Sequence, residues 1–287
     1  MSDFETKILF WNINRNQPGQ HIAAIAQRDN MDIILLAESD YRFMPEALVS
    51  ALNSAPRGRA ASFRHIVDPN DGKVQIFSRI PQDKWKLLVH HSRYQIWRIR
   101  RSKRSDLYLA IGHFQELHYE QGDKQRKLAV DLRFDIQSLE KRVIGREAAA
   151  GHAGLPLIVI GDMNASPFDE GIAGVYALNA TSRRAIAAEG AREMDGKFYP
   201  FMYNPMWQFL SASEDRPAGT YYKRLSKPIC YYWYVLDQVL LRPALMAAVK
   251  DEDIRIVESA GPVSLIKPNG TPIEISDHLP IAVTVHI

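Results

Sequence analysis

The sequence predicts an α/β fold in which two mostly antiparallel β-sheets pack face to face, with helices on the outside. Short apolar stretches typical of strands recur along the whole chain, whereas helical patterns are few. Several of these stretches follow one another without a helix between them, which argues against a doubly wound parallel sheet. No internal repeat or low-complexity linker interrupts the series, so we expect a single domain over residues 1–287.

The composition is that of an ordinary globular protein. Hydrophobic residues make up 46% and charged residues 24% of the 287 residues, which is enough for a sizeable core. The net charge of +3 permits a polyanionic partner without requiring one. The single cysteine, Cys230, excludes an internal disulfide and favours a reducing compartment. The sequence shows neither a signal-peptide pattern nor an apolar stretch of membrane-spanning length, and we expect a cytoplasmic protein that does not act at a membrane.

The first half of the chain predicts mainly strands. A helix is expected over residues 19–30, where Ile22, Ile25 and Ala26 recur at helical spacing, and Pro45 begins a second helix that ends near residue 53. The strands are predicted from apolar runs bounded by turn residues. They span residues 7–11, 32–37, 74–78, 85–89, 94–100 and 107–113.

The second half predicts the longest helix, over residues 123–143, from an amphipathic stripe. Its apolar members are Leu128, Leu132, Ile136, Leu139 and Val143. Short helices are expected at 168–178 and 182–190, and the aromatic-rich segment 195–234 is expected to form long ordered loops. The remaining strands are predicted at 157–160, 235–241, 254–257 and 281–286.

The stretch Leu157–Pro167 carries the clearest chemical signal. An apolar run ends at Gly161, and Asp162 and Asn164 follow two residues apart. In an extended segment that spacing points both side chains the same way, so a carboxylate that can orient a nucleophile lies beside an amide that can donate to an oxyanion. An Asx turn that only closes the strand is the structural alternative.

Other predicted strands end in residues of the same kind. Asn12, Glu38 and His113 each follow an apolar run, and Asp277 with His278 precedes the last one. Each of these residues alone is equally consistent with an ordinary turn or strand-end charge. Together they indicate groups that bind metal or move protons.

Asp237 is placed differently, inside the apolar run that begins at Val235. An ionised carboxylate in a buried strand needs a partner. A histidine is the obvious candidate, since a carboxylate fixes the tautomer of a histidine and raises its pKa. A purely structural core aspartate is the alternative.

Taken in order, these segments resemble the motifs of the endonuclease/exonuclease/phosphatase superfamily, the DNase-I-like group. The resemblance runs from residue 7 to residue 287 and implies a four-layer α/β sandwich. Each motif is short, and the signal lies in their order and spacing. The motifs are Trp-Asn-Ile-Asn (11–14), the glutamate at 38, Ile-Phe-Ser-Arg-Ile-Pro (76–81), Gly-His-Phe (112–114), Gly-Asp-Met-Asn (161–164), Leu-Asp-Gln-Val-Leu (236–240) and Ser-Asp-His-Leu-Pro (276–280).

The resemblance implies a divalent cation, Mg²⁺ with Mn²⁺ as an alternative. Glu38 is its implied main ligand, with Asn12 beside it and Asp277 completing that side of the site. Asn14 departs from the family pattern, because many family nucleases carry an aspartate there; an amide binds a cation more weakly, which puts a second metal in doubt. Gln75 also departs, since small apolar residues are usual at its position.

The resemblance also implies the catalytic roles. Asp162 would orient or deprotonate the attacking water, and Asn164 would hold a phosphoryl oxygen. His278, supported by Asp237, would face the phosphate and stabilise developing charge, and His113 would be a second phosphate-facing histidine. Such an arrangement suits phosphate ester hydrolysis, which needs charge neutralised on the oxygens and a water held in line with the leaving group.

Two segments are candidates for binding substrate. The basic run at residues 98–104 includes Arg98 and Arg100, which we predict to grip a phosphate backbone, although a solvated hairpin has the same composition. The aromatic segment before Asp237 contains Tyr222 among lysines and arginines, and we predict that Tyr222 stacks on substrate. Some of these aromatic residues must instead belong to the core.

The sequence therefore predicts a metal-dependent phosphoesterase that hydrolyses phosphodiester bonds by direct attack of water. Nucleic acid is the expected substrate, because the chain is basic and carries the two segments above; this makes the protein a nuclease. One alternative is a phosphatase or phosphodiesterase acting on a small molecule such as an inositol phosphate or nucleotide. Another is a nucleic-acid-binding module without catalysis, and the retained acidic and histidine set argues against it. No protein partner can be inferred from the sequence.

Overall fold

The computed structural model describes residues 5–54, 61–70, 72–101, 106–114, 122–145, 154–211, 217–225 and 230–286. Two large sheets form its centre. In the six-stranded first sheet the order is β16 (Ile254–Ile256), β19 (Ile281–Val285), β1 (Thr6–Asn12), β2 (Ile33–Ala37), β4 (Val74–Ser78) and β3 (Arg64–Ile66). In the seven-stranded second sheet it is β5 (Trp85–His91), β6 (Tyr94–Ile99), β7 (Leu107–His113), β8 (Leu157–Asp162), β15 (Asp237–Leu241), β12 (Met202–Tyr203) and β9 (Ala180–Thr181).

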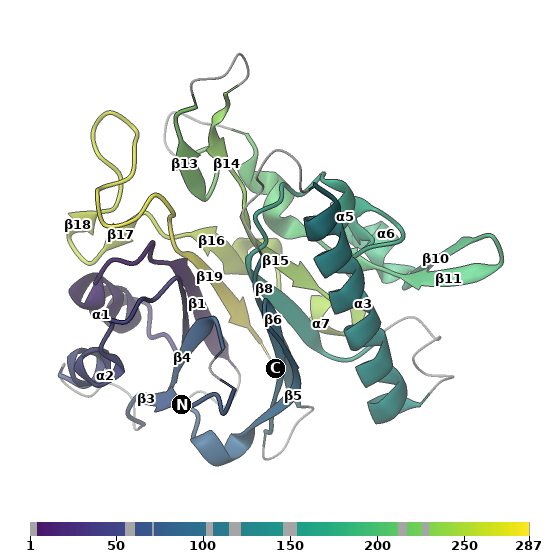
Figure 1. The fold of residues 1–287 in the computed structure, drawn as a ribbon, viewed down its shortest axis with the longest axis horizontal. Helices are drawn as coiled ribbons and strands as arrows, with labels where there is room; N and C mark the ends of the chain where they lie inside the picture. The colour runs from purple at the N-terminus through teal and green to yellow at the C-terminus, as the bar shows by residue number, and fades with distance from the viewer. Residues whose placement is uncertain are drawn as a thin grey trace.

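The two sheets lie between two helical layers. Helices α1 (Gly19–Arg28) and α2 (Pro45–Asn53) cover the outer face of the first sheet, and α3 (Gly122–Ile144) covers the second (Figure 1). Most neighbouring strands are antiparallel; the parallel pairs are β1 with β2, β7 with β8, and β9 with β12. The predicted four-layer sandwich of two mostly antiparallel sheets is therefore confirmed.

The central strands are apolar on both faces because both faces are covered. Ile8, Leu9 and Phe10 of β1 are completely buried. All residues of β8 are buried too, and its last residue, Asp162, is only 1% exposed. Such strands show no alternation of apolar and polar residues, which explains why continuous apolar runs predicted them correctly.

Helix α3 packs on the second sheet through the middle of its predicted stripe. Leu132, Ile136 and Leu139 are buried, whereas Val143 is 47% exposed near the end of the helix. Beside the stripe, buried Glu140 accepts a hydrogen bond from Nε of Arg242, at 2.8 Å. This pair lies far along the sheet from the strand ends described below, and it fixes the helix to the chain that follows β15.

The segment from 195 to 234 differs from its prediction. Instead of long loops it contains short strands. Strand β11 (Lys197–Pro200) pairs with β10 (Ala191–Met194), which comes just before the segment, and β13 (Tyr221–Lys223) pairs with β14 (Tyr232–Tyr234). Aromatic cross-strand neighbours stabilise such two-stranded ribbons, although the many polar and proline residues hide the pattern. The helices predicted at 168–178 and 182–190 are shorter, α5 (Glu170–Ala173) and α6 (Arg184–Ala188).

No helix in the described ranges is long and apolar enough to cross a membrane. The cytoplasmic location stays a prediction. Cys230 is a free thiol in the described part of the chain.

Strand direction brings one edge of both sheets together, and we call it the site edge. The parallel strands β1, β2, β7 and β8 end there, and the antiparallel strands β4, β6, β15 and β19 begin there. Side chains just after the first group and just before or at the start of the second group therefore share this edge.

Candidate active site

Backbone register brings the predicted polar residues to the site edge. Asn12 pairs with Ala37, the residue before Glu38, on the first sheet. On the second sheet His113 and Asp237 both pair with Asp162, one from each side. Asp162 and Asp237, which are 75 positions apart in the chain, are therefore neighbours through strand pairing.

Two glycines let the strands β7 and β8 approach at this edge. Gly112 pairs with Gly161, whose φ of +153° is unfavourable for other residues. A Cβ on Gly161 would lie only 1.9 Å from the carbonyl oxygen of Gly112. The glycines in the Gly-His-Phe and Gly-Asp-Met-Asn motifs thus have a steric role, which is to let His113 and Asp162 lie side by side.

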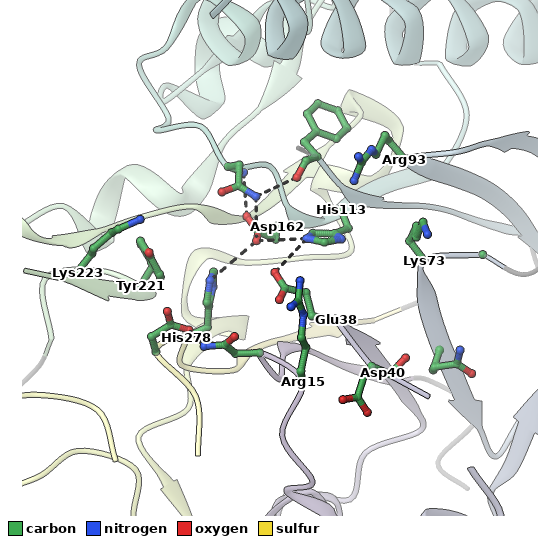
Figure 2. Close-up of a pocket in the computed structure, with 17 residues that line it drawn as sticks. Arg15, Glu38, Asp40, Lys73, Arg93, His113, Asp162, Tyr221, Lys223 and His278 are labelled. Atoms are coloured by element: carbon green, nitrogen blue, oxygen red, sulfur yellow. Dashed lines mark hydrogen bonds and ion pairs between the residues drawn. The ribbon is translucent and has the colours of Figure 1, made fainter. Parts of the chain in front are cut away.

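Asp237 and His278 form a buried pair. The Nδ1 atom of His278 lies 2.8 Å from Oδ2 of Asp237, and its Nε2 atom lies 4.0 Å from Oδ2 of Asp162. Burial alone would lower the pKa of His278, but the charge and hydrogen bond of Asp237 outweigh it and raise that pKa to about 9. The imidazole is therefore cationic at neutral pH, with its Nε2 edge turned toward Asp162 and the pocket (Figure 2).

Neighbouring groups fix the position of this pair. The Oγ1 atom of Thr220 accepts a hydrogen bond from the backbone N–H of Asp237, at 3.1 Å. The Oγ atom of Ser276 accepts from the backbone N–H of His278, at 3.0 Å, and the indole of Trp11 donates to the carbonyl of His278, at 2.9 Å. The backbone of His278 is fixed by Ser276 and Trp11, and its ring is fixed by Asp237, so the imidazole has little freedom to rotate.

Asp162 is as buried as Asp237, at 1% exposure. It accepts hydrogen bonds from Nδ2 of Asn12, at 3.0 Å, and from the backbone N–H of Asn164, at 2.8 Å. Burial raises its pKa above the usual aspartate range, while the nearby His278 and His113 act in the opposite direction. Its ionised form therefore depends on these donors and histidines.

Glu38 lies across the pocket from the buried pair (Figure 2). It adopts a φ of +56°, a rare conformation for a glutamate, and its carbonyl accepts from the backbone N–H of Arg15, at 2.9 Å. Its Oε1 atom is 3.4 Å from Nε2 of His113 and 3.0 Å from Nδ2 of Asn12. The hydrogen bond from His113 is the main reason that the pKa of Glu38 falls to about 2, so Glu38 is ionised at neutral pH.

The donor set fits a divalent cation. Ligand atoms of Glu38, His113 and Asp162 all lie within 4.8 Å of one another, and a second such group joins Asp162 to Asp237 and His278. The ionised Glu38 faces a pocket of about 750 Å³, which leaves room for water ligands as well as substrate. Asp237 and His278 are paired with each other, so Glu38, His113 and Asp162 are the better placed of the two groups to hold a metal.

Asp277, a predicted ligand, lies on the same pocket but outside these groups. Its Oδ1 atom accepts a hydrogen bond from Nδ2 of Asn14, at 3.0 Å, and burial raises its pKa. Asn14 therefore has a defined task, which is to orient Asp277. The amide at position 14 keeps this bond without adding a further negative charge.

The two predicted amides serve Asp162. The oxygen of Asn12 accepts from the backbone N–H of Asn14, at 3.0 Å, which turns its NH₂ group toward Glu38 and Asp162. The NH₂ group of Asn164 donates to the carbonyl of Phe114, at 2.9 Å, and to Oδ2 of Asp162, at 3.2 Å. In this arrangement both amides orient carboxylates, and the predicted ligation by Asn12 and phosphoryl contact by Asn164 stay predictions.

The three predicted substrate contacts are not among the residues that line the pocket. Arg98 lies near the end of β6, whose other end, Tyr94, is the one at the site edge; Arg98 instead faces Asp106, at 3.7 Å. Arg100 follows that far end, and Lys103 and Arg104 lie outside the described residues. Side chains alternate between the two faces of β13, and Tyr221 and Lys223 line the pocket. The side chain of Tyr222, between them, therefore points to the opposite face.

Several residues that line the pocket were not predicted as site residues, and among them are Lys73, Arg93, Tyr221 and Lys223. Lys73 and Arg93 come immediately before β4 and β6, whereas Glu38, His113 and Asp162 lie at or just after the ends of strands. Lys73 and Arg93 can be predicted only if the first residues of β4 and β6 and the antiparallel direction of these strands are known. On a strand, Tyr221 and Lys223 share one face and Tyr222 lies on the other, so the choice of Tyr222 excluded the two residues that line the pocket.

Tyr221 packs on His278, and we expect its removal to matter more than that of Tyr222. Its ring centroid lies 4.6 Å from that of His278. Truncation in Tyr221→Ala removes one wall of the imidazole, and we expect a loss in kcat/KM of about tenfold. Steady-state kinetics of Tyr221→Ala and Tyr222→Ala on the same phosphodiester test this. An equal or larger loss in Tyr222→Ala would favour the original prediction.

The fold and the site together define a class of protein. Carboxylates, amides and a cationic histidine meet at one edge of a sandwich of two sheets, which is an arrangement for hydrolysing phosphate esters. The model of the Endonuclease/Exonuclease/phosphatase family matches residues 9–278, and the chain belongs to this family. The predicted superfamily and the predicted enzyme class, a phosphate-ester hydrolase, are confirmed.

Solved structures show the same fold at low sequence identity. An AP endonuclease from Leishmania major aligns over 100% of this chain and 89% of its own, with 14% identity and a TM-score of 0.56. Truncated TDP2 from Caenorhabditis elegans aligns over 99% and 98%, with 16% identity and a TM-score of 0.53. A family protein from Bacteroides thetaiotaomicron aligns over 98% and 94%, with 14% identity and a TM-score of 0.54. A search of curated protein sequences gives no match.

Proposed function

We propose that this protein is a divalent-metal-dependent phosphodiesterase that cleaves nucleic acid by direct attack of water. The observation that carries the proposal is the alignment of Asp237, His278 and Asp162 beside the ionised Glu38. Buried acidic groups held around a cationic imidazole are costly to fold, and phosphate ester hydrolysis gives each of them a use.

The proposed roles follow from the protonation states. Asp162 accepts a hydrogen bond from the attacking water and orients it, because its carboxylate lies between both histidines. Cationic His278 donates from Nε2 to a phosphoryl oxygen as negative charge grows there. Glu38 and His113, with Asp162, would hold a cation, which when bound neutralises charge on the phosphoryl oxygens.

Nucleic acid is the proposed substrate because the pocket is wide and polar and contains cations on two sides (Figure 2). A structure of similar fold is an AP endonuclease, and another is the endonuclease domain of TRAS1, a telomere-specific non-LTR retrotransposon, at 14% identity and a TM-score of 0.51. These likenesses support the proposal at the level of substrate class.

A panel of phosphate substrates tests the proposal. Labelled DNA, labelled RNA, inositol phosphates and nucleotides are incubated with Mg²⁺ or Mn²⁺, and Glu38→Ala is the comparison. We expect cleavage of nucleic acid that excess EDTA abolishes and Mg²⁺ restores, and a Glu38→Ala variant that needs about tenfold more metal for half-maximal rate. Full turnover in EDTA would contradict metal dependence. Intact nucleic acid with dephosphorylated inositol phosphates would instead assign a small-molecule phosphatase.

A further inference from the structure

Lys73 and Arg93 are basic side chains that line the pocket on the side of His113, and Arg15 lies beside Glu38 (Figure 2). Figure 2 shows Lys73 and Arg93 on this side, whereas Tyr221 and Lys223 lie beyond His278 on the other. The centre of the pocket, where Asp162 lies, is between the two groups. A substrate whose reacting phosphate is at the centre therefore has cations on both flanks.

Lys73 and Arg93 are placed by the same strand register that builds the site. Lys73 precedes Val74, which pairs with Ala37, the residue before Glu38. The carbonyl of Arg93 accepts from the backbone N–H of His113, at 2.9 Å. One cation thus comes from each sheet, and each is fixed beside a residue of the proposed metal group.

The chain around Lys73 is held against the second sheet. Buried Gln95 on β6 donates a hydrogen bond to Asp68, in the connection that leads to Lys73. A Cβ on Gly72 would meet the ends of both of these side chains, so a larger residue before Lys73 would displace them. The two flanking cations are therefore positioned in advance, at the junction of β4 and β6.

Neither cation has an ion-pair partner among the described residues. Within the described residues, no carboxylate lies within ion-pair distance of Lys73 or Arg93, whereas Arg42, Arg98 and Arg126 have such partners. Next to Lys73, Gln75 lines the pocket while its Oε1 atom accepts from Nε2 of His65, at 2.8 Å. The NH₂ group of Gln75 is therefore a further hydrogen-bond donor at the pocket, which explains why a polar residue occupies position 75.

We propose that Lys73 and Arg93, with the amide of Gln75, form a second phosphate subsite. It binds a phosphate group of the substrate adjacent to the phosphate that is hydrolysed. The inference rests on the proposed function, because it places the reacting phosphate at Asp162. It adds that the preferred substrate carries at least two phosphates, as the backbone of a nucleic acid or a polyphosphorylated small molecule does.

The test measures binding in EDTA, so that it does not depend on turnover. Anisotropy of a labelled single-stranded oligothymidine is titrated at several KCl concentrations with the wild-type chain, Lys73→Ala, Arg93→Ala and Lys86→Ala. Lys86 is an exposed lysine on β5 that pairs with Arg98, away from the site edge, and is the matched control. For each lost phosphate contact we expect the slope of log K against log salt to fall by about 0.7, with no change in Lys86→Ala.

A second arm compares inositol 1,4-bisphosphate with inositol 1-phosphate in the same proteins. A reduced oligonucleotide slope in Lys73→Ala and Arg93→Ala supports the subsite and identifies a nucleic acid backbone as its ligand. An unchanged slope with a lost preference for the bisphosphate supports the subsite and identifies a small polyphosphorylated ligand. If both readouts match those of Lys86→Ala, the subsite is refuted. Failure of the proposed hydrolysis with a reduced slope would refute the function and leave the subsite standing.

Discussion

The variant Asp162→Asn will lower kcat by about a thousandfold or more while the protein stays folded. The change keeps the size of the side chain and removes the charge that orients water, at a position 1% exposed. Asn12 and Asn164 donate three hydrogen bonds to the carboxylate of Asp162. In Asp162→Asn one acceptor oxygen becomes an NH₂ group, which faces these donors and cannot accept from them. Single-turnover hydrolysis of a labelled phosphodiester measures the loss.

The matched control is Asp40→Asn. Asp40 lines the same pocket, and its carboxylate pairs with Arg42 at 2.6 Å and not with the histidines. Removal of its charge should change kcat less than about threefold, and the thermal unfolding of both variants shows whether either has lost its fold. If Asp162→Asn retained more than about a tenth of the wild-type rate, Asp162 would not be the residue that orients the nucleophile.

The variant Asp237→Asn will neutralise His278 and lower kcat at least about a hundredfold at neutral pH. Burial lowers the pKa of His278 and the charge of Asp237 is the main opposing cause, so without that charge the pKa should fall well below its value of about 9. An NMR titration of the imidazole in metal-free protein measures this directly. The resonance is assigned by its absence in His278→Gln.

The same pair makes stability depend on pH. The pKa of His278 is higher in the folded protein, about 9, than the ordinary 6.5, so proton binding stabilises the folded state. The contribution is fully present below about pH 6.5 and is lost as the pH rises through about 9, and it is on the order of 3 kcal/mol from the shift in pKa. Urea unfolding at pH 6 and pH 9.5 should show this loss in the wild-type protein and not in Asp237→Asn. A parallel loss in both proteins would assign it to other groups.

The sequence determined the architecture because both faces of the main strands are covered. A strand buried on both faces is a continuous apolar run in the sequence, and a polar residue at its end is therefore easy to recognise. Asp162 at the end of Leu157–Asp162 is an example. The order of such ends along the chain resembles one family, which the family match confirmed. The pairing of Asp237 with a histidine was also predictable, because a buried charge requires a partner.

Only the tertiary structure decided which side chains share the pocket. Strand direction places Arg93, just before β6, at the site edge, and it places Arg98, five positions later, near the far end of β6. Alternation on a three-residue strand places Tyr221 and not Tyr222 against His278. The sequence analysis fixed neither the ends nor the faces of these short elements, because aromatic and basic residues are tolerated on either side of a surface ribbon. Cross-strand register, which joins residues far apart in the chain, makes that choice.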